Sequence, residues 1–207
     1  ITASLAFNFN YARHFKTTVS LFYSGNSGSK YTYLVNGDLN SDGRFGNDLL
    51  YVPKDQSEIK FIDFLNSDNT VRFTAAQQAT AFDNFINNDR YLKNRRGMYT
   101  ERNQNHTPWE SVLDGRFAQD FYIMTGSTRH TLEFTFDVFN LTNLINKKWG
   151  RQYSVGNQAY NILTVLNRTT GPVASQGKGY NFTIGQDPWN INFGSRFQGQ
   201  IGLRYSF

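Results

Sequence analysis

The residues with the clearest potential for chemistry lie in one acidic loop. Asp38, Asn40 and Asp42 alternate along the chain, and Gly43 and Asp48 follow. Oxygen ligands spaced in this way, with a glycine for the sharp turn, are typical of the start of a calcium-binding EF-hand loop. The spacing therefore makes Asp38, Asn40, Asp42 and Asp48 candidate ligands for Ca²⁺ or another hard cation.

A second interpretation of this loop stays open. The last EF-hand position, which is normally a bidentate Glu, is occupied by Leu49, and no convincing helix lies on either side. Asp, Asn and Gly are also ordinary turn residues, because Asp and Asn bond their own backbone and Gly accepts a positive φ. A cation would here rigidify a loop, since no catalytic group accompanies it, and the sequence makes no other cofactor certain.

Catalysis finds little support elsewhere. His14, His106 and His130 are scattered, and no zinc-protease, nucleophile-elbow or P-loop motif occurs. Asp114 and Asp120 lie on one predicted strand, about 20 Å apart at the rise of an extended chain, which is too far for an acid–base pair. We therefore expect no enzymatic activity.

The net charge of +5 does not indicate a nucleic-acid partner, because most basic residues are dispersed. The densest basic cluster contains Arg90, Lys93, Arg95 and Arg96, with Arg102 close behind. A basic loop that faces anionic lipid head groups or an acidic ligand is the commoner meaning of such a cluster. The absence of cysteine excludes disulfides and thiolate metal sites.

The elements that carry these residues are predicted to be strands, and the last one is the clearest. Successive side chains of a strand point to opposite faces. In the final segment one face is apolar and the other is polar, which is typical of the closing strand of an outer-membrane barrel. The apolar face contains Phe197, Ile201, Leu203, Tyr205 and Phe207, and the polar face contains Arg196, Gln198, Gln200, Arg204 and Ser206.

Similar alternation predicts about five long antiparallel strands. Short turns and long stretches alternate between them, as in outer-membrane barrels with short periplasmic turns and long outer loops. Alternation already at Ile1 suggests a fragment that starts in mid-strand. The strands cover about residues 1–12, 16–35, 109–124, 130–141 and 190–207, and the extracellular loops cover about residues 36–108 and 142–189.

The first long stretch contains one predicted helix. Thr74 is a suitable N-cap, and apolar residues recur on one face of a 3.6-residue period. Gly97 is a suitable stop signal. The apolar positions are Ala75, Ala79, Phe82 and Ile86.

The predicted fold class is all-β: the C-terminal segment of a large transmembrane β-barrel, with a short helix in a long extracellular loop. No apolar run approaches the roughly 20 residues of a spanning helix. Five strands cannot close a barrel with a lipid-facing exterior, since the smallest has about eight. A soluble two-sheet protein shows the same period of two and is the alternative. The polar residues expected to face the lumen are Arg116, Glu133, Asp137, Arg196 and Arg204.

Four segments carry a resemblance to a known family. They are Asp38–Gly43 with Gly46–Pro53, Trp109 with Asp114, Arg116 and Gln119–Phe121, Phe139–Leu141 with Asn143–Asn146 and Trp149–Gly150, and Gln200–Phe207. Together they resemble the C-terminal end of TonB-dependent outer-membrane receptors, specifically the Oar-like and SusC-like relatives of Bacteroidetes-type bacteria. The likeness implies a 22-stranded barrel with a plugged lumen, in the bacterial outer membrane.

The resemblance also implies function and partners. Long outer loops would capture a ligand, and energised uptake would pass through the plugged lumen. The partners would be outer-membrane lipid, the remaining barrel and the plug, a TonB-type energy transducer, a surface lipoprotein, and the barrel-assembly machinery, which would recognise Leu203, Tyr205 and Phe207. Two alternatives stay open: a structural or interaction barrel docked to a lipoprotein or secretion complex, and a soluble glycan-binding β-sandwich.

Overall fold

The computed structural model describes residues 1–168 and 172–207. The chain is mostly β, with antiparallel sheets and two α-helices among the described residues. It divides into two compact units. Unit 1 consists of Ile1–Gly28, Pro108–Ser154 and Ile191–Phe207, and unit 2 of Ser29–Thr107 and Val155–Asn190.

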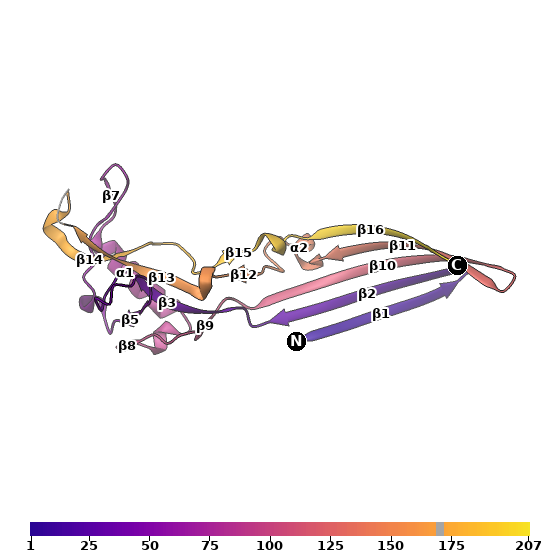
Figure 1. Ribbon diagram of the computed structural model, residues 1–207, viewed down its shortest axis with the longest axis horizontal. Coiled ribbons are helices and arrows are strands. Elements are labelled where there is room, and N and C mark those ends of the chain that lie inside the picture. Colours follow the sequence, from indigo (N-terminus) through magenta and orange to yellow (C-terminus); the bar gives the residue numbers. More distant parts are fainter. Residues whose placement is uncertain (169–171) are drawn as a thin grey trace. The chain divides into compact units, whose positions relative to one another are not determined.

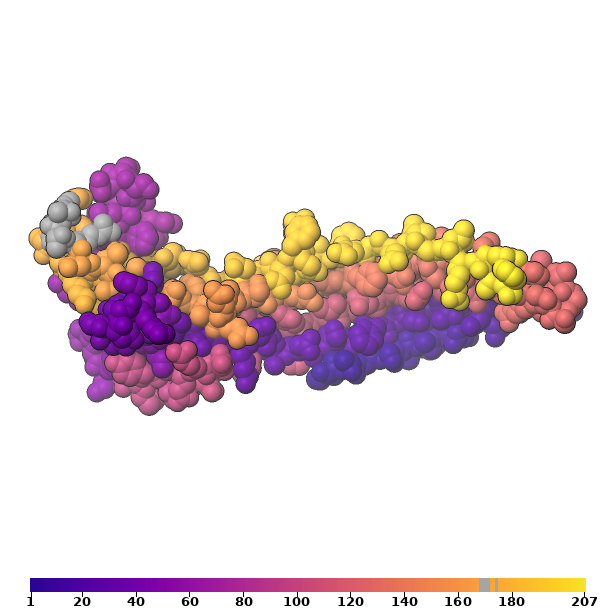
Figure 2. All heavy atoms as spheres, viewed as in Figure 1, coloured from indigo at the N-terminus to yellow at the C-terminus, as the bar shows by residue number. Residues whose placement is uncertain are grey.

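Unit 1 is built on a five-stranded antiparallel sheet in the order β1-β2-β10-β11-β16, whose strands lie side by side in Figure 1. This agrees with the predicted all-β, antiparallel class. The sheet is open, with β1 and β16 at its two edges, as the indigo and yellow atoms of Figure 2 show. The strands are β1 (Thr2–Tyr11), β2 (Phe15–Asn26), β10 (Glu110–Thr125), β11 (Thr128–Phe139) and β16 (Gln198–Ser206).

Two tight turns and the C-terminus lie at the same end of this sheet, because β1, β10 and β16 run in one direction. The first turn uses Ala12 and Arg13 with positive φ, and the second uses Gly126 at φ 61°. At the opposite end lie α2 (Leu141–Ile145), β12 (Tyr153–Ser154) and the 3₁₀ helix η5 (Phe193–Ser195). The short strand β15 (Asn190–Ile191) precedes η5.

Unit 2 contains a mixed sheet in the order β14-β13-β3-β4, with β9 also paired to β3. Strands β3 and β13 are parallel, whereas β14 and β4 are antiparallel to their neighbours. Two short antiparallel pairs complete the strands: β6 with β7, which follow one another in the chain, and β5 with β8, which are separated by helix α1 (Ala75–Asn88). The strands are β3 (Lys30–Asn36), β4 (Asp48–Leu49), β5 (Tyr51–Val52), β6 (Phe64–Leu65), β7 (Val71–Phe73), β8 (Met98–Tyr99), β9 (Asn105–His106), β13 (Ala159–Arg168) and β14 (Gly177–Phe182).

The hydrophobic core of the chain lies in unit 2. It joins the sheet to helix α1 (Ala75–Asn88) and excludes water from aromatic and aliphatic side chains. The 3₁₀ helices of this unit are η1 (Gln56–Glu58), η2 (Leu92–Asn94), η3 (Gly156–Gln158) and η4 (Ala174–Gln176). The most completely buried large residues are Tyr31, Tyr33, Phe82, Leu50, Ile62, Ile86, Leu92 and Leu163.

The predicted helix is present and begins as expected. Thr74 is the N-cap of α1, and its hydroxyl accepts a hydrogen bond from the backbone nitrogen of Gln77. In return, the Gln77 side-chain oxygen accepts a hydrogen bond from the Thr74 backbone nitrogen. This capping box satisfies two of the helix's free donors. The predicted end was wrong: the helix stops at Asn88, before Gly97, because Asp89 adopts an extended conformation. No helix among the described residues combines the length and apolarity needed to cross a membrane.

The predicted strand over residues 16–35 is two strands in different sheets. Strand β2 ends at Asn26, Gly28 has φ 75°, and β3 starts at Lys30. Tyr31 through Val35 are buried on both faces, so β3 cannot be the half-exposed continuation of β2. Of the stretch 36–108, predicted to be an irregular loop with one helix, residues 36–107 belong to the packed unit 2, as do the described residues among 155–189 of the second predicted loop. The extracellular position of these residues stays a prediction.

Candidate functional site

One face of the sheet in unit 1 consists mainly of apolar side chains that lie directly opposite one another, with Thr17 and Gln119 as a hydrogen-bonded polar pair among them. In each of the four strand pairs, apolar residues of one strand lie opposite apolar residues of the next, so this face extends over all five strands. Partners in register share a face, so the rows merge into one apolar face. One row consists of Phe7, Val19, Phe117, Phe136 and Ile201. Another consists of Tyr11, Phe15, Phe121, Leu132 and Tyr205.

This apolar face is exposed. The exposed fractions of its exposed members run from 36% at Leu21 to 71% at Leu203, and Phe15 is half-buried. Within unit 1, therefore, no other described element covers this face. Soluble monomers rarely expose contiguous apolar patches larger than a few hundred Å². The face therefore marks a contact surface. Its exposed members are Leu5, Phe7, Phe9, Tyr11, Val19, Leu21, Phe117, Phe121, Ile123, Leu132, Phe134, Phe136, Ile201, Leu203 and Tyr205.

The opposite face of the same sheet is mostly polar, with exposed apolar exceptions such as Phe22 and Met124, and it carries charges that pair across strands. The Arg116 Nε lies 3.4 Å from Asp137 Oδ1, and the Arg204 Nε lies 3.7 Å from Glu133 Oε1. Cross-strand pairs of this exposed kind contribute about 0.2–1 kcal/mol each. These four residues share the polar face, as the alternation predicts, and that they face a lumen stays a prediction.

The predicted strand over residues 190–207 needs correction at Arg196, while a lumen-facing position of this residue stays a prediction. Strand β16 starts only at Gln198, and Arg196 follows η5 with its guanidinium 4.5 Å from the centre of the Phe193 ring. The reason lies in Asn140, whose side-chain nitrogen donates to the Ser195 carbonyl oxygen at 2.6 Å. This bond holds the chain in a turn where alternation alone predicts a strand.

Asn140 is the centre of a buried polar cluster at the end of β11. It has φ 55° and is 4% exposed, and its side-chain nitrogen also donates to the Gly150 carbonyl oxygen at 2.7 Å. Its backbone nitrogen donates to Asp114 Oδ1, and its side-chain oxygen accepts from the Thr142 hydroxyl. The segment that carried the family resemblance therefore has a local structural role.

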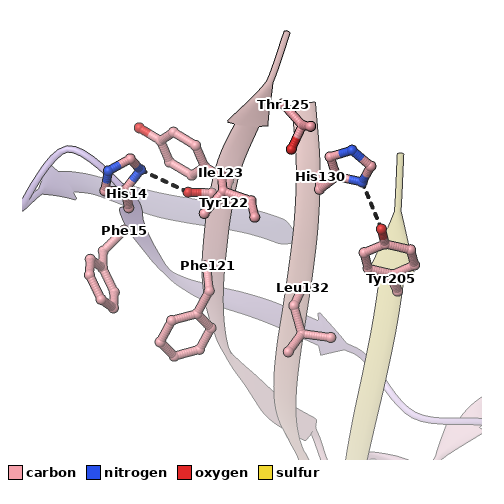
Figure 3. Close-up of a pocket in the computed structure, with 9 residues that line it drawn as sticks. All are labelled: His14, Phe15, Phe121, Tyr122, Ile123, Thr125, His130, Leu132 and Tyr205. Carbon is pink, nitrogen blue, oxygen red and sulfur yellow. Dashed lines mark hydrogen bonds between the residues drawn. The ribbon is translucent and has the colours of Figure 1, made fainter. Parts of the chain in front are cut away.

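A cavity of about 740 Å³ lies at the end of the sheet with the short turns. Figure 3 shows His14 next to the Tyr122 carbonyl oxygen, 3.0 Å from Nδ1, and His130 next to the Tyr205 hydroxyl, 2.7 Å from Nδ1. Two of the three histidines that are scattered in the sequence thus line one cavity. The lining is otherwise mostly apolar and contains Phe15, Phe121, Ile123, Thr125 and Leu132.

The residues of the predicted assembly signal are exposed on the closing segment. Leu203 and Phe207 are 71% and 85% exposed, and the Tyr205 ring stacks on Phe207 with 5.7 Å between centres. The His130 ring stacks on the same two aromatic rings. Recognition of these residues by assembly machinery stays a prediction.

The acidic loop directs its oxygens towards hydrogen-bond donors of its own chain. Asp38 accepts from the backbone nitrogens of Asp42 and Gly43 at 3.1 and 2.9 Å, and Asp48 accepts from Leu39 at 2.8 Å. The Asn40 side-chain oxygen accepts from the Asp42 nitrogen. Among the described residues, no group of three His, Cys, Asp or Glu side chains is arranged to hold a metal. These bonds favour the turn interpretation of Asp38, Asn40, Asp42 and Asp48.

Unit 2 contains a buried chain of hydroxyl groups that the sequence did not reveal. Tyr31 donates to the Tyr33 hydroxyl at 3.0 Å, and Tyr33 donates to Asp89 Oδ2 at 2.7 Å. Burial raises the pKa of both phenols, and the neighbouring Asp89 charge raises them further. The phenols therefore stay protonated and act as hydrogen-bond donors within the core.

The basic residues that the folded chain brings together differ from the basic cluster that is visible in the sequence. In the predicted cluster, Arg95 pairs with Glu101 and Arg96 pairs with Asp83, so two of its charges are neutralised. A basic cavity in unit 1 was missed, because its cations lie on two segments far apart in the chain. Those cations are Lys147, Arg151 and Arg196.

Comparison with known proteins gives no relative. No protein-family model matches the chain, no curated protein matches it, and no solved structure matches it. The functional argument therefore rests on the geometry of the two faces of the sheet.

Proposed function

We propose that this chain is part of a transmembrane β-barrel in the bacterial outer membrane, similar to TonB-dependent receptors. The observation that carries the proposal is the exposed apolar face of the unit 1 sheet, opposite a polar face with paired charges. Alternation of lipid-facing apolar and lumen-facing polar residues is the pattern of barrel strands. The five strands have 9 to 16 residues, enough for the 9–11 of a tilted transmembrane strand.

The open edges support the same proposal. β1 and β16 each have a neighbour on one side only among the described strands, and open sheet edges do not occur within hydrocarbon. In the proposed barrel, further strands of the same protein pair with both edges and enclose the polar face. Arg116, Glu133, Asp137 and Arg204 then line a hydrated lumen, where they contact a plug or passing solute.

Unit 2 has the properties expected of a ligand-capturing outer region. It has its own aromatic core, and a packed core can hold surface residues in fixed positions. In the proposed receptor this unit captures the ligand outside the cell, and a TonB-type transducer energises passage through the lumen. The exposed apolar face argues against the alternative of a soluble sandwich, in which a second sheet would cover Phe134 and Phe136.

Localisation is tested by fractionating cells that produce the protein. We expect it in outer membranes, retained through alkaline carbonate washing and released only by detergent. Recovery of folded protein in the soluble fraction without detergent would contradict the membrane proposal.

Transport is tested separately, with cells that have or lack the protein and a panel of labelled glycans, peptides and metal chelates. We expect uptake of one class that depends on the protein and stops when the proton gradient is collapsed. Membrane localisation without any such uptake would instead favour a structural or interaction barrel docked to a lipoprotein or secretion complex.

A further inference from the structure

The basic cavity in unit 1 lies between two segments that are far apart in the chain. It has a volume of about 390 Å³ and is lined from residues 143–151 and 191–196. Three of the lining residues are cationic, and none is acidic. The cavity is lined by Asn143, Lys147, Arg151, Ile191, Asn192, Phe193, Ser195 and Arg196.

Hydrogen bonds fix the two segments that form this cavity. The Asn143 side chain donates to the Trp149 carbonyl oxygen at 2.9 Å and accepts from the Phe197 nitrogen at 3.3 Å. The Gln152 nitrogen donates to the Ser195 hydroxyl at 2.8 Å, and Ser195 is 3% exposed. The backbone that carries the cations is therefore held in place before any ligand binds.

The cations in the cavity are not neutralised by carboxylates. In the part of the chain that the structure describes, no ion pair involves Lys147, Arg151 or Arg196. Arg151 Nε donates to the Lys147 carbonyl oxygen at 3.4 Å, which leaves its two terminal nitrogens for a ligand. Glu110 lies outside the lining and accepts from the Tyr153 nitrogen.

Apolar groups surround the same cavity. Phe193 and Ile191 are 75% and 51% exposed, and the Arg196 guanidinium lies over the Phe193 ring. Trp149 is 54% exposed in the segment between Lys147 and Arg151. A site with three cations and an exposed aromatic rim suits an anion attached to an apolar body.

We propose that Lys147, Arg151 and Arg196 bind a phosphoryl group. Two guanidinium groups match phosphate oxygens in a bidentate fashion, and the lysine adds a compact positive charge. A phosphate monoester carries more charge than a carboxylate and compensates more of the three cations. The group comes either from a lipid head group, whose chains contact Phe193 and Ile191, or from a soluble phosphate. The proposal does not depend on the barrel, because the site lies wholly within unit 1.

The test is binding of phosphatidic acid in phosphatidylcholine nanodiscs and of inorganic pyrophosphate to the detergent-purified chain, measured by native mass spectrometry and calorimetry. The triple variant Lys147→Gln, Arg151→Gln, Arg196→Gln is expected to bind the preferred probe at least about tenfold more weakly. The reason is that it loses three charge-assisted hydrogen bonds to the phosphoryl group, and about 1.4 kcal/mol of binding free energy corresponds to a factor of ten. The matched control is Arg90→Gln, Lys93→Gln, Arg102→Gln, which removes the same charge from exposed residues of unit 2. It is expected to bind like the parent chain.

Each outcome is decisive. Preference for phosphatidic acid identifies a lipid head group as the source, and equal binding of pyrophosphate identifies a soluble phosphate. Equal losses in the two triple variants would show unspecific charge attraction and overturn the proposal, as would a parent chain that binds neither probe. If the triple variant misfolds by circular dichroism, Arg151→Gln replaces it with an expected loss of about threefold, and Arg151→Lys is expected to recover part of that loss.

Discussion

The side-chain nitrogen of Asn140 donates a 2.7 Å hydrogen bond to the backbone carbonyl oxygen of Gly150. This bond joins the end of β11 to the segment that returns towards the closing strand. Gly150 is needed there for two reasons: its φ is 61°, and a Cβ would collide with the Asn140 side chain. A left-handed backbone and a close approach both favour glycine.

The first prediction concerns this contact. Gly150→Ala is expected to destabilise unit 1 by about 2–4 kcal/mol, from left-handed strain plus overpacking. Gly126→Ala is the matched control, because Gly126 also has φ 61° but has open space around its Cβ position. We expect the control to lose only the strain component, about 1–2 kcal/mol. Urea denaturation in detergent measures both, and equal losses would contradict the packing role of Gly150.

A second prediction concerns Gln78, which is completely buried in unit 2. Its nitrogen donates to the Ile62 carbonyl oxygen at 2.8 Å, and its oxygen accepts from the Phe182 nitrogen at 2.9 Å. Gln78→Ala removes the side-chain partner of the buried Phe182 nitrogen, whereas the Ile62 carbonyl oxygen keeps the bond from the Asn181 side chain. We therefore expect a loss of about 1–3 kcal/mol. Thr80→Ala, exposed on the same helix, is expected to change stability by less than about 0.5 kcal/mol. Similar unfolding midpoints for the two variants would contradict this role.

A third prediction concerns alkaline pH. Burial raises the folded-state pKa of Tyr31 and Tyr33, whereas an unfolded tyrosine titrates near pH 10. Their contribution to stability is full below about pH 10; at higher pH the unfolded chain loses protons that the folded chain keeps. Stability should then fall by about 1.4 kcal/mol per pH unit for each tyrosine.

Urea unfolding between about pH 9 and about pH 11 measures this slope. Tyr33→Phe removes one of the two phenols. Above about pH 10, the unfolding free energy of the variant is expected to fall less steeply with pH than that of the parent, by about 1.4 kcal/mol per pH unit. A slope that stays the same in the variant would contradict the buried, protonated state of Tyr33.

A fourth prediction concerns the two faces of the sheet. Phe136→Lys places a charge on the apolar face, where barrel strands lose about 2–4 kcal/mol near the bilayer midplane. Gln200→Lys places the same charge on the polar face, opposite Asp137 in the register. We expect the first variant to be depleted from membranes and the second to insert normally. Equal insertion would argue that Phe136 does not contact lipid.

The sequence predicted what depends on local periodicity. Alternation along residues 1–12 and 130–141 is carried by side chains that the structure places on opposite faces, and Thr74 was predicted as the N-cap from its position directly before the apolar period. The core of unit 2 depends instead on the parallel pairing of β3 with β13, between segments far apart in the chain. No local pattern shows which distant segment β3 will contact, so the packed unit looked like two loops.

The site residues divide in the same way. Arg116 and Asp137 were found because each follows the alternation of its own strand. Arg196 was wrongly assigned to the closing strand, because the bond from Asn140 to Ser195 ends the periodicity before β16. Lys147 and Arg151 were missed, since only the folded chain brings them to the cavity that Arg196 also lines.

The most direct measurement of the central claim is spin labelling along β16 in lipid bilayers. The chain has no cysteine, so single cysteines at positions 200 to 205 report one site each. Collision with oxygen, which is concentrated in lipid, should be highest at Ile201, Leu203 and Tyr205, and collision with a water-soluble nickel chelate should be highest at Gln200 and Arg204. If the nickel chelate reaches Ile201 and Leu203 as readily as Gln200 and Arg204, the apolar face does not contact lipid, and the proposed barrel is wrong.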